Sequence, residues 1–218
     1  MRLNHKPILF LIILILMLGI AAWRAGLNLL PVTPPKIYGM TFSEPKTLAP
    51  FVLQSAGGRA FTQKDLHGHW SFIYFGYTHC PDACPITMLQ FKQLQETLRK
   101  TMPKQRLAFI MVTVDPERDT PKLMQAYVNH FATSFHGLSG DSMEIKAFAK
   151  QLFVGYQRGE DNTAIGYTMY HSDSIAVINP DGQFAAVFAS PHKAKNMAQD
   201  FLKVAAYQQQ RDQSLFYR

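Results

Sequence analysis

Apolar residues occur along this chain in two kinds of pattern, short runs with few interruptions and longer segments with helical spacing. The runs at 69–75 and 107–114 are rich in aromatic and aliphatic residues, which is typical of strands buried on both faces. A third run at 174–178 leads into the turn sequence Asn179-Pro180-Asp181-Gly182. We therefore expect 184–188 to pair back as the last strand.

Helical segments follow these runs, and a hairpin precedes them. Residues 51–62 place two glycines between short apolar stretches, which predicts the hairpin. Thr120 before Pro121 predicts an N-cap and first turn, and Asp141 with Glu144 three residues later resembles a capping box. The expected helices cover about 85–100, 121–131, 142–153 and 193–208. This order of elements predicts a mixed α/β sheet with helices on both of its faces.

The N-terminus carries basic residues ahead of an apolar run, 8–23, that contains no charge. As a helix this run would be about 24 Å long, slightly short of a bilayer core of ~30 Å. We expect residues 1–24 to form a single-pass anchor in the cytoplasmic (inner) membrane, with Trp23 and Arg24 at the interface and the N-terminus inside. A cleaved signal peptide is the alternative. Either reading places the rest of the chain in the periplasm or an equivalent extracytoplasmic space.

Prolines at four positions between 25 and 47 predict a stiff tether after the anchor. One domain is expected over 48–208, followed by a polar tail at 209–218. The length of 218 residues and the 47% apolar content fit a single globular domain with appendages.

The net charge of +7 changes this picture little. The basic residues are scattered, and no basic helix or aromatic-interleaved strip is present to indicate nucleic-acid binding. A solvated face, or attraction to an anionic membrane surface, accounts for them.

Both cysteines of the chain, Cys80 and Cys84, lie in one stretch with three residues between them. Such a pair can form a disulfide, bind a soft metal, or do both in turn. A purely structural disulfide is the weaker explanation, because so small a loop constrains the unfolded chain little. Structural zinc needs four ligands, whereas Cu(I) accepts two or three. We expect Pro85 to take the first helical position, which makes Cys84 the N-cap and favours its thiolate.

A cysteine pair at the first strand-to-helix junction indicates a thioredoxin-like fold with an N-terminal β-hairpin and insertions. In that fold the loop entering the strand at 174–178 faces the cysteines, so His171 is the candidate imidazole ligand. A lone histidine is more often a surface residue or a satisfied core residue. The other seven histidines are expected at the terminus, in a turn, pointing away from Cys80, or on the surface.

The segment Phe75-Gly76-Tyr77-Thr78-His79-Cys80-Pro81-Asp82-Ala83-Cys84-Pro85 resembles the signature of the Sco/SenC family of copper-binding assembly proteins. A second segment, from Thr113 to Pro121, is similar to that family's second motif. The resemblance implies a membrane-anchored, thioredoxin-like copper metallochaperone, rather than an enzyme, that helps to build the copper centre of cytochrome c oxidase. Its partner would be the copper-bearing subunit of that oxidase.

By the same resemblance, Cys80, Cys84 and His171 match the copper ligands, with Cu(I) as the metal and Cu(II) as a further possibility. Asp115 and Asp119 match an acidic loop near the site. Both also have structural explanations, since Asp119 can cap the following helix and Asp115 can brace the turn.

A thiol–disulfide oxidoreductase or redox sensor, acting on the cysteines of a partner's copper site, is the alternative function. Against general thioredoxin activity stand the three-residue spacer and the lack of a proline in 168–174, where thioredoxins carry one opposite their cysteines. A thiol peroxidase ranks last, because such enzymes need a threonine three positions before the reactive cysteine. Thr78 is only two before Cys80.

Overall fold

The structure is a computed structural model that describes residues 6–24, 33–161 and 166–216. Two compact units are distinguished, one made of 1–33 with 205–218 and the other of 34–204. The larger unit contains the sheet and both cysteines.

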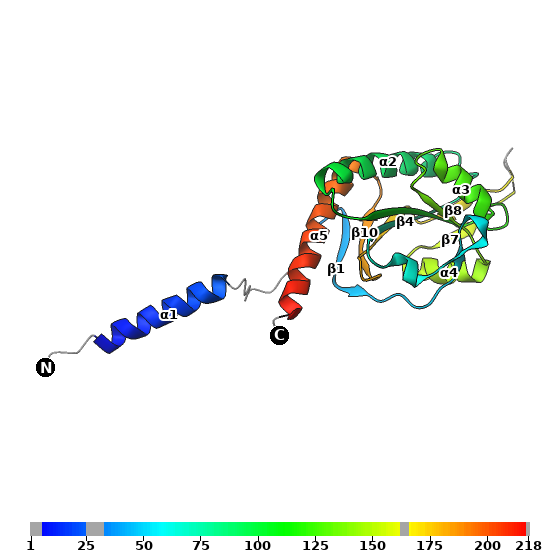
Figure 1. Cartoon of the computed structure of the whole chain (residues 1–218). Helices are drawn as coiled ribbons and strands as arrows, with labels where there is room; N and C mark the ends of the chain where they lie inside the picture. Colours follow the sequence, from blue (N-terminus) through cyan, green and yellow to red (C-terminus); the bar gives the residue numbers. More distant parts are fainter. Residues whose placement is uncertain (1–5, 25–32, 162–165, 217–218) are drawn as a thin grey trace. The chain divides into compact units, whose positions relative to one another are not determined.

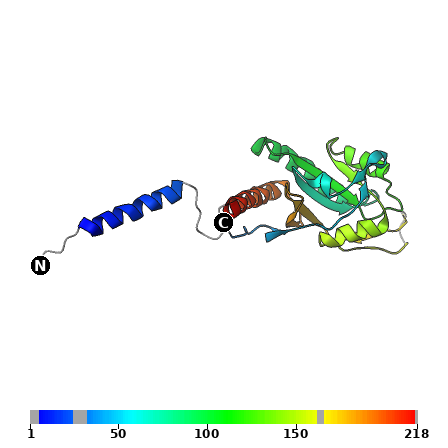
Figure 2. The same cartoon turned by 60° about the horizontal axis from the view of Figure 1, so that its bottom comes forward.

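A six-stranded mixed sheet forms the centre of the larger unit (Figures 1 and 2). Its strands, in spatial order, are β1 (Gly39–Lys46), β10 (Phe184–Ala189), β9 (Ser174–Ile178), β4 (Trp70–Gly76), β5 (Leu107–Thr113) and β6 (His136–Leu138). Strands β4, β5 and β6 are parallel, while β9 pairs antiparallel with both β4 and β10. The expected α/β architecture and all four expected strands are therefore confirmed.

Strand β4 is buried at all seven of its positions because helices cover both faces of the sheet. Helix α2 (Ala83–Thr101) lies on one face and α4 (Ser142–Gln151) on the other (Figure 1). Successive β4 side chains point to opposite faces. Tyr74 accordingly packs against Phe91 of α2, and Phe75 against Phe148 of α4.

The expected helix starts are confirmed at two places. Helix α3 (Pro121–Asn129) begins after Thr120, whose hydroxyl accepts the backbone N–H of Leu123. Asp141 caps α4 by accepting the backbone N–H groups of Met143 and Glu144. The Glu144 carboxylate accepts the N–H of Val52 instead of reaching back to the cap, so it ties α4 to the N-terminal hairpin region.

Two small hairpins accompany the main sheet. The expected one is present as β2 (Leu53–Gln54) and β3 (Ala60–Phe61), joined through the 3₁₀ helix η1 (Ala56–Gly58), and a second 3₁₀ helix, η2 (Gln63–Leu66), follows. The other pairs β7 (Tyr156–Arg158) with β8 (Met169–His171). It is too short and too polar for its pattern to have predicted it.

The expected tether at 25–47 is wrong for its second half, because 39–46 form β1, the edge strand beside β10. An edge strand pairs on one side only, which explains its mixed burial and its tolerance of Pro45. Gly39 permits a close approach here, since a Cβ at that position would lie 2.0 Å from the Val187 carbonyl oxygen. The first half of the tether, 25–32, lies outside the described residues.

The two chain ends also differ from expectation. Helix α1 spans Lys6–Arg24, and its 19 residues rise about 28 Å against a bilayer core of ~30 Å. Within the described ranges no helix is both long and apolar enough to cross a membrane, so the expected membrane span is not supported. Helix α5 (Ala194–Phe216) includes most of the expected polar tail, because 209–216 contain no glycine or proline to stop it.

Candidate metal centre

The two cysteines occupy the connection between β4 and α2, but Cys84 is not the N-cap of the helix. Helix α2 begins at Ala83 after the N-cap residue Asp82, so Cys84 lies within its first turn. The sulfur that meets a backbone N–H at the helix start belongs to Cys80, which accepts the Cys84 N–H at 3.3 Å. The expected roles of the two cysteines at the helix terminus are therefore exchanged.

Burial and hydrogen bonding shift the pKa values of the two free thiols in opposite directions. Cys84 is fully buried, whereas Cys80 is partly exposed. A hydrogen bond from the Cys84 side chain, opposed by burial and helped by His171, lowers the pKa of Cys80 to about 4. The same bond to Cys80, followed by burial, raises the pKa of Cys84. Cys80 is thus the thiolate of the reduced pair, which corrects the expectation that Cys84 would be.

His171 lies beside this pair although 87 positions separate it from Cys84. Its Nε2 is 3.8 Å from Cys84 Sγ, and its Nδ1 is 3.2 Å from the carbonyl oxygen of Ser172. Because a carbonyl oxygen only accepts, Nδ1 donates there and Nε2 faces the sulfurs. Burial is the largest single influence and lowers the pKa of His171, but hydrogen bonds to Cys80 and Ser172 and the nearby charges of Cys80 and Asp173 together raise it above its ordinary value.

The chemistry of these three donors suits a soft monovalent metal. Three donors placed trigonally at about 2.2 Å from an ion are about 3.8 Å apart, and the Cys84–His171 separation has this value. In the described part of the chain, however, no group of three or more His, Cys, Asp or Glu side chains is already arranged to hold a metal ion. The three-donor set therefore stays a prediction.

Asp119 connects the cysteine loop to the end of β5. Its fully buried carboxylate accepts the backbone N–H of Thr78 at 2.9 Å, the hydroxyl of Thr113 at 2.7 Å, and the hydroxyl of Thr78. It does not cap α3, a role taken by Thr120. Asp119 acts on the candidate site through Thr78, two residues before Cys80.

Asp115 braces the same loop and contacts the chain ahead of β8. Its carboxylate accepts the hydroxyl of Tyr167 at 2.7 Å and the guanidinium of Arg118. The Tyr167 ring lies 3.7 Å from the Arg118 guanidinium carbon and 3.6 Å from that of Arg158. Asp115 therefore supports the segment that leads into His171.

Several residues around the site were not expected from the sequence. Gly76 ends β4 directly beside the Cys84 sulfur, and an isolated glycine in a strand is a signal for such a close approach. His192 was expected on the surface but is buried, with Nε2 3.2 Å from Asp173 Oδ1. No local pattern marks His192, because its burial depends on the loop after β8.

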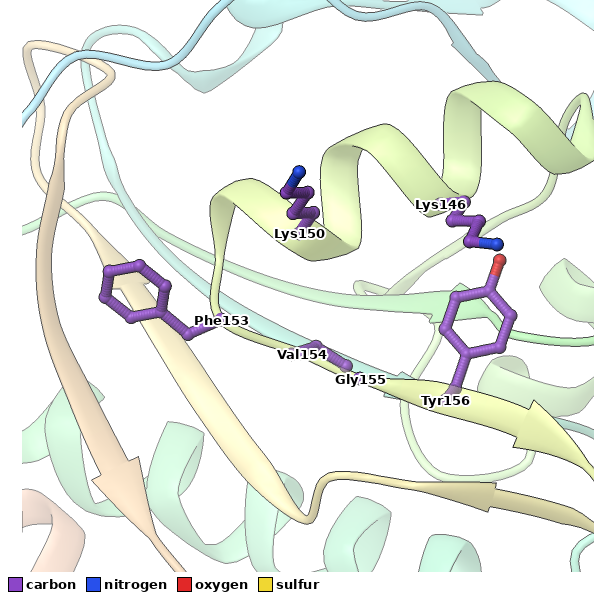
Figure 3. A pocket seen from close by; sticks show the side chains of 6 residues that line it. All are labelled: Lys146, Lys150, Phe153, Val154, Gly155 and Tyr156. Atoms are coloured by element: carbon purple, nitrogen blue, oxygen red, sulfur yellow. The ribbon is translucent and has the colours of Figure 1, made fainter.

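A cavity of about 320 Å³ lies between the end of α4 and the start of β7 (Figure 3). It is lined by Lys146, Lys150, Phe153, Val154, Gly155 and Tyr156. None of the expected site residues lines it. The cysteine–histidine site is therefore a corner of the fold where Cys80 is partly exposed, separate from this cavity.

Comparison with known proteins identifies close similarities. The family model described as SCO1/SenC matches residues 40–206. A SCO2-like protein of Rickettsia prowazekii (strain Madrid E) is 31% identical over 206 residues, which cover 92% of this chain and 98% of that protein. A mitochondrial SCO1 homolog of Mus musculus is 33% identical over 158 residues, 72% of this chain, but the match spans only 56% of the mouse protein.

Among solved structures, the crystal structure of Arabidopsis thaliana ScoI with copper bound is similar to this chain. The TM-score is 0.69 at 29% sequence identity, and the match covers 72% of this chain and 97% of the plant protein. The likeness therefore extends over nearly the whole of that structure.

Proposed function

Because this chain belongs to the SCO1/SenC family, we propose that it is a copper metallochaperone that binds copper through Cys80, Cys84 and His171. The main support for the proposal is the distance of 3.8 Å between Cys84 Sγ and His171 Nε2, with the Cys80 thiolate beside both. A similar protein, the plant ScoI, has been crystallised with copper bound. The family resemblance inferred from the two sequence motifs is confirmed.

Two thiolates and one neutral imidazole would give a Cu(I) site a net charge of −1, which suits a soft cation. Cys80 is partly exposed and Cys84 is buried, so an acceptor would approach from the Cys80 side. We propose that the cargo is passed to the copper-bearing subunit of cytochrome c oxidase. Oxidation of the two thiols to a disulfide removes both sulfur ligands, which links copper occupancy to redox state.

A thiol–disulfide oxidoreductase is the second candidate, favoured by one observation, the pairing of a partly exposed Cys80 thiolate with a buried Cys84 thiol. In this reaction the Cys80 thiolate attacks a disulfide of the partner and releases one partner thiolate. Cys84, on losing its proton, then attacks the Cys80 sulfur of the mixed disulfide. The partner leaves with two thiols, and a Cys80–Cys84 disulfide remains.

We also propose that the folded domain operates in the periplasm or an equivalent extracytoplasmic space. This location fits the disulfide chemistry proposed for Cys80 and Cys84, because disulfides persist outside a reducing cytoplasm. Protease added to intact spheroplasts should degrade the domain while sparing a cytoplasmic marker. Full protection of the domain in intact spheroplasts would contradict the location.

The test of the main proposal is copper stoichiometry and Cu(I) affinity of the reduced full chain, compared with Cys80→Ser and His171→Ala. We expect one copper per chain, held more weakly in both variants, while His171→Ala still forms the disulfide. His130→Ala is the control, because His130 is an exposed histidine after α3 whose ring Nδ1 is 2.8 Å from the Ala126 carbonyl oxygen. If the reduced wild-type chain retains no copper but forms a readily reversible disulfide, the chaperone function is wrong and the oxidoreductase function is favoured.

A further inference from the structure

Tyr74 is a fully buried tyrosine of β4 whose hydroxyl lies at the candidate metal centre. The hydroxyl is 3.8 Å from Cys84 Sγ, within hydrogen-bonding range for sulfur. The side chain of Thr87, one turn along α2 from Cys84, also interacts with this hydroxyl. A buried hydroxyl needs a partner, and Tyr74 finds its partners on α2 at the metal site.

The ring of Tyr74 also contacts the third candidate donor. Its centroid lies 5.8 Å from that of the His171 imidazole, with the two planes at 78°. On another side the imidazole meets the ring of Tyr77, at 6.2 Å and 87°. Edge-to-face contacts of this kind orient both partners. Tyr74 therefore contacts two of the three candidate donors, which come from α2 and from β8.

We propose that Tyr74 is a positioning residue of the copper site, donating a hydrogen bond to the Cys84 sulfur and orienting the His171 imidazole. This inference rests on the proposed copper-binding function and extends it to a residue that is not itself a ligand. A hydrogen bond from an outer group to a ligating atom tunes metal affinity, and such groups commonly contribute tenfold or more.

The hydrogen bond between Tyr74 and Cys84 should stabilise copper binding more than it affects disulfide formation. With copper bound, Cys84 is a thiolate in a fully buried position, where a donor to its negative charge counts most. The disulfide equilibrium is measured on the copper-free chain, so no metal-bound sulfur takes part in it. Loss of the hydroxyl should therefore weaken copper binding much more than it shifts the disulfide equilibrium.

The test is Tyr74→Phe, which removes the hydroxyl and keeps the ring that packs against Phe91 and His171. Cu(I) affinity is measured on the reduced full chain by competition with a chromophoric Cu(I) chelator. The disulfide midpoint potential is measured on the copper-free chain in thiol buffers. We expect about tenfold weaker Cu(I) binding, and a potential within about 10 mV of wild type, since tenfold corresponds to ~30 mV for this two-electron couple.

Tyr156→Phe is the matched control. Tyr156 pairs with His171 across the β7–β8 hairpin, but its hydroxyl points toward Lys146 at the cavity beside α4 (Figure 3). The Tyr156→Phe variant should bind Cu(I) as tightly as the wild-type chain does. Circular dichroism and thermal melts of both variants verify that each is folded before copper is added.

Three results would overturn the role of Tyr74 while leaving the chaperone function standing. These are wild-type affinity in Tyr74→Phe, equal weakening in Tyr156→Phe, and a potential that shifts by ~30 mV together with the affinity. A shift in potential together with affinity would show that Tyr74→Phe disturbs the packing around both cysteines and does not act on copper binding specifically. A wild-type chain that binds no copper would instead overturn the proposed function, and this inference with it.

Discussion

The sulfur of Cys84 packs directly against Gly76, so that a Cβ built on Gly76 would lie 2.9 Å from Cys84 Sγ. The same Cβ would be 2.7 Å from the methyl carbon of Met111 and 3.0 Å from the ring of Tyr74. Gly76, the last residue of β4, therefore provides the space that the buried Cys84 sulfur occupies. It does so by lacking a side chain, since no positive φ requires glycine at this position.

Gly76→Ala should consequently displace the Cys84 sulfur from its buried position. Overpacking of a filled core costs about 1–3 kcal/mol, and we expect unfolding free energy to fall by about 2 kcal/mol. Cu(I) affinity should drop as well, because the sulfur and His171 would no longer meet. Gly57→Ala is the destabilised control, as its positive φ strains an alanine but its Cβ meets nothing within 4 Å. Equal Cu(I) affinities in the two variants would contradict the prediction.

The loop before Cys80 should depend on the buried Asp119 carboxylate. Asp119→Ala leaves the Thr78 N–H and the Thr113 hydroxyl without their acceptor, and we expect a loss of about 3 kcal/mol in unfolding free energy. Amide hydrogen exchange at Thr78 should accelerate at the same time. Asp141→Ala removes an exposed helix cap at a cost of about 1 kcal/mol and should leave that amide unchanged. An unchanged exchange rate at Thr78 in Asp119→Ala would exclude the proposed support.

Alkylation of the reduced, copper-free chain should occur first at Cys80. With a pKa of about 4, this group is a thiolate throughout pH 5–8, so its alkylation rate should be nearly flat there and fall only as pH drops toward 4. Cys84→Ala removes the sulfhydryl whose hydrogen bond chiefly lowers that pKa, and the pH profile should move upward. Peptide mapping by mass spectrometry identifies the labelled residue. Prior labelling of Cys84, or a tenfold rise per pH unit between 6 and 8, would reverse the assignment.

Tyr167 should stabilise the segment that leads into His171. Tyr167→Phe loses the hydrogen bond to the Asp115 carboxylate but keeps the ring between the two arginines, so we expect a loss of about 2 kcal/mol. Tyr170→Phe, at an exposed position of β8, is the control and should change stability little. Denaturant melts measure both. A Tyr167→Phe chain as stable as wild type would show that the arginine contacts suffice.

The sequence predicted the central elements well because their signals are local. Buried strands are visible in the sequence as runs of apolar residues, and the caps at Thr120 and Asp141 lie next to the helices that they start. The motif around the two cysteines led to the correct family, and the thioredoxin-like fold is confirmed by the likeness to the plant ScoI structure. The edge strand β1 was missed, because a strand paired on one side carries a weak pattern.

By itself, the sequence determined that two thiols, with three residues between them, follow a buried strand. Only the tertiary structure decided that Cys84 is the buried thiol and Cys80 the partly exposed thiolate, since this depends on where α2 begins and what packs against it. It also brought His171 to the pair from 87 positions away and buried His192. Burial and proximity of this kind arise from contacts between distant segments, which no local pattern of residues encodes.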